Sequence, residues 1–235
     1  MYTTLFLVQA GIQLLLLFWL VRIYRATGLA VALMLFIPQF GLVYDNLIVG
    51  LGRFIGIGEF LKAISWPRFW IHWLFGAWLI IACGAMLRLA GFAWAQHKGV
   101  MVAFCALTAS LMVLDLPYFW TTALYPVCEF DLVRYSVQVP AGLRCSPDQR
   151  VVPGQGAPIA SVITCLVVIA TGLVLLVKRR FPWVFAGGFL MLLSAMPLLS
   201  AWKLDNFGEI LIAGGCIWGI AHFAGNRRST LARRS

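Results

Sequence analysis

Seven apolar runs, each of about 20 residues, recur along this chain and limit its possible folds more than any other feature. An apolar helix of that length crosses the hydrocarbon core of a bilayer with all its backbone polar groups paired. We therefore predict an all-α bundle of about seven transmembrane helices, forming a single domain over residues 1–235. The predicted spans are Tyr2–Val21, Leu29–Gly52, Phe69–Leu89, Val100–Trp120, Ile159–Val177, Pro182–Trp202 and Phe207–Ala224, with a kink expected at Pro197.

The composition excludes an ordinary soluble domain. Charged residues make up 11% of the chain, whereas soluble proteins carry about 25%. A net charge of +10 is also typical of nucleic-acid-binding proteins. The basic residues, however, lie at the ends of the apolar runs, where they orient membrane helices, so we expect no nucleic-acid partner.

The charge distribution predicts an N-terminus outside and a C-terminus in the cytoplasm. In that orientation 11 of the 18 Lys and Arg residues are cytoplasmic, including 178–180, and all eight acidic residues are outside. No basic residue precedes the first run and no cleavage site follows it, so we expect a first transmembrane helix rather than a cleaved signal peptide. Together with the short loops, this suggests a multi-pass protein of a bacterial inner (plasma) membrane.

The longest connection, at about 121–158, is predicted to be an extracytoplasmic loop rich in proline and glycine. It contains Cys128 and Cys145. Because the outer compartment is oxidising, a disulfide between them is favoured over two free thiols. The remaining cysteines lie in apolar runs and are expected to act as small packing residues: Cys83, Cys105, Cys165 and Cys216.

Polar residues inside the predicted helices provide the candidate site, since ionisable groups in a membrane usually serve function or pairing. They lie near the outer side in four spans, and we expect them to line one polar cavity open to the outer leaflet. The alternative is a set of buried ion pairs, such as Asp45 with Arg68, that only fixes helix packing. The full set is Tyr44, Asp45, Asn46, Arg68, His72, Asp115, Asp205 and Glu209.

Three local patterns bear on this site. Arg68 and His72 are four residues apart and share a helix face, and Pro67 is expected in the first turn of that helix. The glycine-rich stretch 50–59 could be a re-entrant or interfacial segment rather than a tight loop. The four-residue sequence that starts at Tyr44 resembles the one that starts at Leu204, but it is too short to establish an inverted repeat.

The chemistry that these residues support is proton transfer by carboxylates. No His-x-x-x-His or Cys-x-x-Cys pair occurs, so we expect no metal and no cofactor. A carboxyl group in a low-dielectric cavity can hold a proton near neutral pH and pass it to a lipophilic substrate. We assign Asp45, Glu209 and Asp205 as catalytic. The residues expected to bind or position the substrate are Tyr44, Asn46, Arg68, His72 and Asp115.

The chain has acidic residues on an early helix and on a late helix, and this arrangement resembles that of a known family. In length and helix number the chain resembles small membrane-embedded terpene cyclases of the fungal meroterpenoid type. This resemblance implies that Asp45 and either Asp205 or Glu209 act as catalytic acids on an isoprenoid.

Our first hypothesis is therefore an enzyme that processes a lipid or isoprenoid at the outer leaflet. A second is a small proton- or cation-coupled transporter that uses the same acids as a relay. A third is a non-catalytic subunit of a membrane complex, with 121–158 binding the partner. Membrane lipids and a lipophilic small molecule are the expected partners, and a protein partner or a homo-oligomer is left open.

Overall fold

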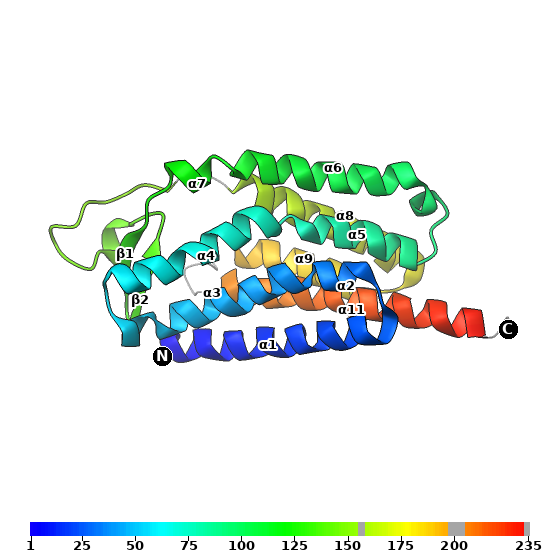
Figure 1. Ribbon diagram of the computed structural model, residues 1–235, viewed down its shortest axis with the longest axis horizontal. Helices are drawn as coiled ribbons and strands as arrows, with labels where there is room; N and C mark the ends of the chain where they lie inside the picture. Colours follow the sequence, from blue (N-terminus) through cyan, green and yellow to red (C-terminus); the bar gives the residue numbers. More distant parts are fainter. Residues whose placement is uncertain (155–157, 197–204, 233–235) are drawn as a thin grey trace.

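The structure, a computed structural model, describes residues 1–154, 158–196 and 205–232, without the side chains of Asp205 and of 226–232. It is mostly helical, and its long helices run along the long axis of the molecule (Figure 1). The α-helices are α1 (Tyr2–Thr27), α2 (Ala30–Met34), α3 (Phe36–Ile55), α4 (Glu59–Phe75), α5 (Trp78–Leu89), α6 (Lys98–Asp115), α7 (Tyr118–Thr121), α8 (Ile159–Arg179), α9 (Trp183–Ser194) and α11 (Asp205–Ala232). The remaining elements are the 3-10 helices η1 (Trp94–Gln96) and η2 (Ala141–Leu143) and the strands β1 (Tyr125–Glu129) and β2 (Leu132–Ser136).

The helices fit a membrane protein. Within the described residues, five segments are long and apolar enough to cross a bilayer, and a sixth arises if α4 and α5, bent by 42°, form one span. The apolar helix α9 has 12 residues, shorter than a full span. The rest of the predicted sixth span, with Pro197, lies outside the described residues. The count of seven therefore stays a prediction.

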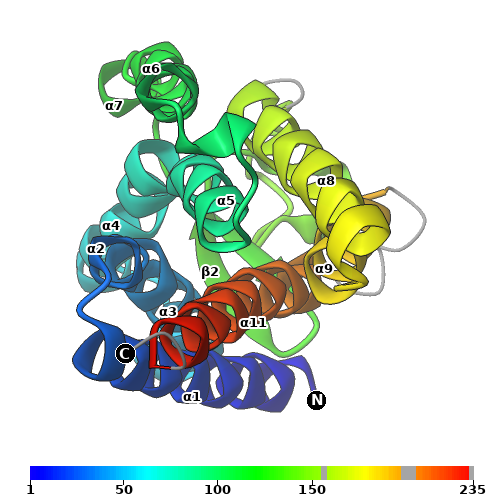
Figure 2. The same cartoon turned by 90° about the vertical axis from the view of Figure 1, so that its right-hand side faces the viewer.

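Helix α11 lies at the centre of the bundle, between α1, α3, α5 and α9 (Figure 2). Glycines allow the closest of these approaches. A Cβ on Gly187 of α9 would collide with the backbone of Leu211, and one on Gly215 of α11 would lie 2.6 Å from the Trp183 carbonyl oxygen. Small residues at such interfaces let membrane helices approach closely. By contrast, α6 lies at the edge of the bundle in Figure 2 and is the least buried of the five long spans.

Helix α4 begins ten residues earlier than predicted. A short turn at 56–58 separates it from α3, and Gly56 there has a φ of +81°, which a side chain would disfavour. The stretch 50–59 is therefore the end of α3 and a short turn rather than a re-entrant segment, and its position at the membrane interface stays a prediction. Pro67 lies inside α4 instead of in its first turn. The helical stretch then breaks at 76–77, between α4 and α5.

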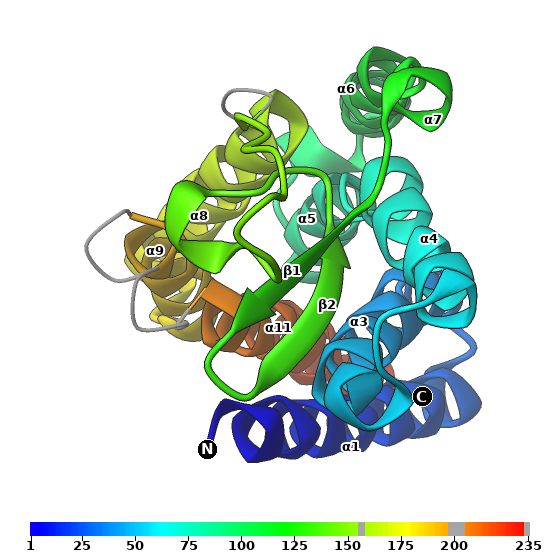
Figure 3. The ribbon, with the colours of Figure 1, turned by 90° about the vertical axis from the view of Figure 1, so that its left-hand side faces the viewer.

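The predicted extracytoplasmic loop contains an antiparallel hairpin of β1 and β2, so the all-α expectation was incomplete. A two-residue turn with a positive φ of 52° at Phe130 joins the strands. Figure 3 shows the hairpin lying across one end of the bundle. Leu124 and Tyr135 pack there with Ile48 of α3 and Leu61 of α4. We call this the hairpin end.

Two further contacts fasten the hairpin. Cys128 of β1 and Cys145 form a disulfide, the pairing favoured from the sequence. Asp131, in the turn, accepts hydrogen bonds from the backbone N–H groups of Tyr2 and Thr3 and from the N-terminal ammonium of Met1. A carboxylate at this position satisfies the free N–H groups at the start of α1.

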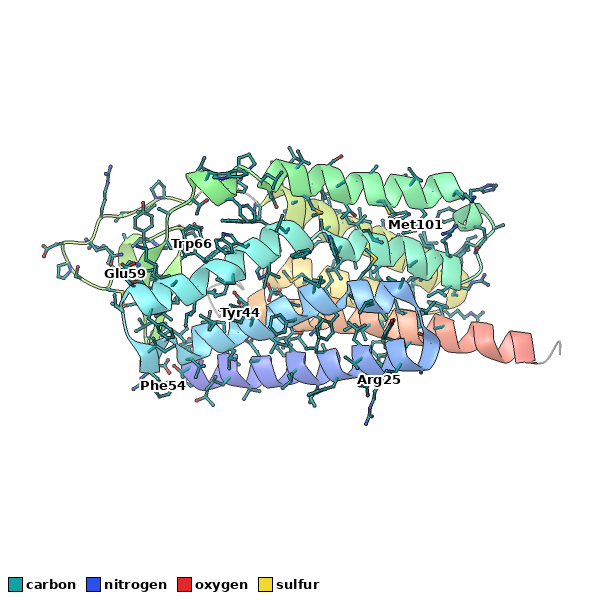
Figure 4. The ribbon with its side chains drawn as sticks, in the orientation of Figure 1. Arg25, Tyr44, Phe54, Glu59, Trp66 and Met101 are labelled. Atoms are coloured by element: carbon teal, nitrogen blue, oxygen red, sulfur yellow. A yellow bond between two sulfur atoms is a disulfide. The ribbon has the colours of Figure 1, made fainter. Side chains whose placement is uncertain are left out.

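Acidic residues at the hairpin end lie beside basic ones, since Glu59 pairs with Lys62 and Asp131 lies near Arg53. In Figure 4, Glu59 lies at the hairpin end and Arg25 at the opposite end. At that opposite end Arg88 donates hydrogen bonds to the carbonyl oxygens of Ala95 and Gln96, and the Arg179 guanidinium lies 4.9 Å from the centre of the Phe92 ring. The orientation expected from the charge distribution stays a prediction.

Candidate functional site

A buried ion pair joins α3 to α4 below the hairpin. Arg68 donates from Nε to Oδ1 of Asp45 over 2.7 Å, and both side chains are less than a tenth exposed. Arg68 also donates from Nη1 to the carbonyl oxygen of Tyr135 in β2, over 3.3 Å. The helices meet closely because Gly41 of α3 lies against the Ile71 side chain, where a Cβ would not fit. The pair suggested as the architectural alternative is therefore present.

Helix α11 supplies a second contact to the same carboxylate. Asn206 donates from Nδ2 to Oδ2 of Asp45 over 3.2 Å and to Oδ1 of Asn46 over 3.3 Å. The Asn46 amide donates in turn to the Leu42 carbonyl oxygen. Sequence reasoning did not select Asn206. The resemblance between the segments at Tyr44 and Leu204 was the available signal, since it contains both asparagines.

His72 and Glu209 complete the cluster. His72 Nε2 lies 4.0 Å from Oε1 of Glu209, and one ligand-type atom from each of Asp45, His72 and Glu209 lies within 4.8 Å of the others. His72 is one turn beyond Arg68 on α4, and Glu209 is three residues beyond Asn206 on α11. Two carboxylates and an imidazole at this separation can exchange protons or hold a cation.

A cavity of about 120 Å³ lies beside the cluster. It borders the break between α4 and α5, and its wall comes from α3, α4, α5, α8, α9 and α11. Most of the wall is aliphatic, while Gln39, His72 and Glu209 are its main polar groups. The hairpin lies over the end of the bundle where Asp45 and Arg68 are buried (Figure 3). Asp45 and Arg68 are therefore covered at that end, whereas the side chain of His72 is 39% exposed. The opening of the cavity toward the outer leaflet stays a prediction.

Three of the predicted site residues are not part of this cluster of side chains. The Tyr44 hydroxyl donates to the Ile64 carbonyl oxygen over 2.8 Å, and its ring lies between α3 and α4 (Figure 4). Asp115 ends α6, which packs mainly on α5 and contacts α4 less. In the described part of the chain it makes no hydrogen bond or ion pair with the cluster. The side chain of Asp205 lies outside the described residues.

A row of buried amides lies outside the set of site residues predicted from the sequence. Gln39 donates from Nε2 to the backbone oxygen and to Oε1 of Gln13, over 2.9 and 2.7 Å. Gln9 lies one turn away on α1, and neither of its amide atoms has a hydrogen-bond partner among the described residues. Gln39 also lines the cavity, so the row reaches the cluster's surroundings from α1.

These features define a helical protein of the polytopic membrane type with a polar centre inside its bundle. The chain matches no family model, and no curated protein is significantly similar to it.

Proposed function

We propose that this protein is an integral membrane enzyme that transfers protons to and from a lipid or isoprenoid substrate. The observation that carries the proposal is the meeting of Asp45, His72 and Glu209 beside an apolar cavity in the membrane-spanning part of the bundle. Ionisable groups at that depth are costly and commonly functional. An aliphatic wall with a few polar groups suits a molecule that is mostly hydrocarbon.

The cluster divides into two parts under this proposal. His72 and Glu209 line the cavity and are the groups that a substrate would reach. Asp45 lies behind them, held by Arg68 and Asn206, and it orients the cluster. This differs from the sequence-based assignment, in which Asp45 and Glu209 shared the chemistry and His72 positioned the substrate.

The wall of the cavity favours a simple proton shift over cyclisation. Among the described residues, its lining includes no Phe, Tyr or Trp side chain. A terpene cyclase needs aromatic ring faces to stabilise carbocations. The cyclase activity implied by the resemblance therefore has no support at this cavity. An isomerisation or a similar rearrangement by protonation and deprotonation fits the aliphatic wall better.

The proposed location is the inner membrane of a bacterium, with the hairpin end outside. The support is the group of basic residues at the opposite end, such as Arg25, Arg88 and Arg179, and the disulfide at the hairpin end. A disulfide forms and persists in an oxidising compartment such as the periplasm.

The test compares membrane lipid extracts by mass spectrometry from cells that produce the wild type, Glu209→Gln, or Asp115→Asn as a matched control. We expect the lipid species formed by the wild type to fall about 100-fold or more with Glu209→Gln, the usual loss for a general acid or base. Asp115→Asn should leave it unchanged. Identical lipid profiles in all strains, with correctly folded protein in each, would reject the proposal.

The row of amides supports one alternative, a proton-coupled transporter. The two amide atoms of Gln9 have no hydrogen-bond partner in the described part of the chain, which is costly in a membrane unless water reaches them. Water there would extend a polar path from the cavity along α1. In proteoliposomes with an internal pH dye, this alternative predicts proton flux that Glu209→Gln abolishes and Gln9→Leu reduces. Absence of flux in the wild type would leave the enzyme as the remaining proposal.

A further inference from the structure

Three atoms of metal-ligand type form a triangle at the wall of the cavity. They are one oxygen each of Asp45 and Glu209 and one ring nitrogen of His72, all within 4.8 Å of one another. A cation at the centre of an equilateral triangle with sides of 4.0 to 4.8 Å lies about 2.3 to 2.8 Å from each corner. Zinc–nitrogen and zinc–oxygen bonds are about 2.0 to 2.2 Å long, so each side chain would move inward by less than about 1 Å. We propose that these three residues bind a divalent transition-metal cation.

The donor set indicates the class of cation. Magnesium and calcium prefer sites built of oxygen alone, whereas an imidazole suits zinc, iron and similar metals. Three protein ligands also match catalytic metal sites, which keep at least one position open for water or substrate. Sequence reasoning expected no metal because no pair of ligands lies close together along the chain. Here each ligand comes from a different helix, α3, α4 or α11, so local spacing carries no signal.

The surroundings of Asp45 resemble the second layer of contacts around a metal ligand. Its Oδ1 accepts from Arg68 and its Oδ2 accepts from Asn206, over 2.7 and 3.2 Å. A carboxylate oxygen has two lone pairs, so either oxygen can accept a hydrogen bond and still coordinate a cation. Such partners hold a ligand in orientation and commonly change metal affinity by about 10- to 100-fold when removed.

The open coordination position would face the cavity. His72 and Glu209 line the cavity, whereas Asp45 lies behind them, so the cation would be held between the protein interior and the cavity space. A metal ion lowers the pKa of its bound water to about 7. That water would give its proton to the substrate, and the resulting hydroxide would take a proton from another atom of the same substrate, which leaves the site unchanged.

This inference rests on the proposed function, because it names a cofactor for the same cluster. With the cation bound, the three side chains act as its ligands and the bound water performs the proton transfer. Without it, the side chains would have to transfer the proton themselves. An experiment can distinguish the metal-dependent mechanism from the metal-free one, because metal content is measured without any substrate.

The experiment measures metal in protein purified in mild detergent through a tag that contains no histidine. Inductively coupled plasma mass spectrometry of the wild type grown with zinc, manganese and iron should find about one transition-metal ion per chain. His72→Gln and Glu209→Gln should lower this content about tenfold or more, whereas Asp115→Asn should keep it. As a second measurement, the chelated wild type is titrated with Co²⁺, whose visible absorption reports imidazole and carboxylate ligation, and with Mg²⁺ as the control cation.

Each outcome of this experiment either supports or overturns the proposed metal site. Stoichiometric metal in the wild type that is lost in both ligand variants supports the site, even if membrane lipids do not change, in which case the proposed function alone fails. Wild-type protein that holds less than about a tenth of an ion per chain and gives no Co²⁺ spectrum overturns the metal site. Lipid changes with Glu209→Gln would then still support the enzyme. Equal metal content in wild type and folded ligand variants also overturns the site, because the ion must bind elsewhere.

Discussion

Asn206 on α11 donates a hydrogen bond from Nδ2 to Oδ2 of Asp45 on α3, over 3.2 Å and 161 positions of sequence. The same amide also reaches Asn46, so the last described helix is tied to the third through two neighbouring polar residues. This contact places α11 so that Glu209, one turn further on, faces His72. The candidate site therefore depends on a side chain that is outside the set predicted from the sequence.

The ion pair between Asp45 and Arg68 predicts asymmetric mutational effects. Arg68→Met leaves a buried carboxylate without its cation, which should lower the free energy of unfolding by about 3 to 5 kcal/mol. The double variant Asp45→Leu with Arg68→Met removes both charges and should recover most of that loss. Thermal unfolding in detergent measures both. A double variant as unstable as the single one would show that the pair does more than cancel charge.

The buried amides predict opposite effects of substitution on α1 and on α3. Gln9→Leu replaces an amide that has no described partner, so the free energy of unfolding should rise by about 1 kcal/mol. Gln39→Leu removes two hydrogen bonds to Gln13 and should lower it by a similar amount. The midpoints of thermal unfolding of the two variants give the comparison. Equal destabilisation by both would indicate that ordered water satisfies Gln9.

Gly52 marks the contact between α3 and the hairpin. A Cβ at this position would collide with the carbonyl oxygen of Val133 in β2, so Gly52→Ala must push the strand away from the helix. We expect it to destabilise the protein by about 1 to 3 kcal/mol, as overpacking commonly does. Gly11→Ala is the matched control, because open space surrounds Gly11 in α1 and alanine favours a helix. If both variants unfold at the same temperature, α3 and the hairpin do not pack closely at Gly52, and the prediction is wrong.

Asp131 predicts a pH dependence at the hairpin end. The N-terminal ammonium of Met1, with the N–H groups of Thr3 and Tyr2, holds the pKa of this carboxyl well below its usual range. A lowered pKa stabilises the fold above the unfolded value, about 3.9, and that contribution disappears as the pH falls toward the folded value. Wild type should therefore exceed Asp131→Asn in stability at pH 7, and the difference should shrink below about pH 4.

Unfolding of the two proteins by denaturant at pH 7 and at lower pH measures this difference. Arg53→Gln serves as a control, because its guanidinium lies 3.9 Å from Asp131 at an exposed position and should contribute little. A constant difference between wild type and Asp131→Asn at all pH values would contradict the assignment.

Part of the site was accessible from the sequence. The spacing of Arg68 and His72 placed both on one helix face, and both do reach the cluster around Asp45. Asp115 was included among the predicted site residues because it lies at a similar depth in its apolar run. Depth alone is not sufficient, because α6 packs mainly on α5 and Asp115 makes no hydrogen bond or ion pair with the cluster among the described residues.

The sequence by itself determined that most of this chain is apolar helix, because hydropathy is a property of each segment and its solvent. It also indicated the cysteine pair. Tertiary structure alone decided which polar groups meet. Close contacts at Gly41, Gly187 and Gly215 set the approach of neighbouring helices, and only those approaches place Asn206 and Glu209 against Asp45 and His72.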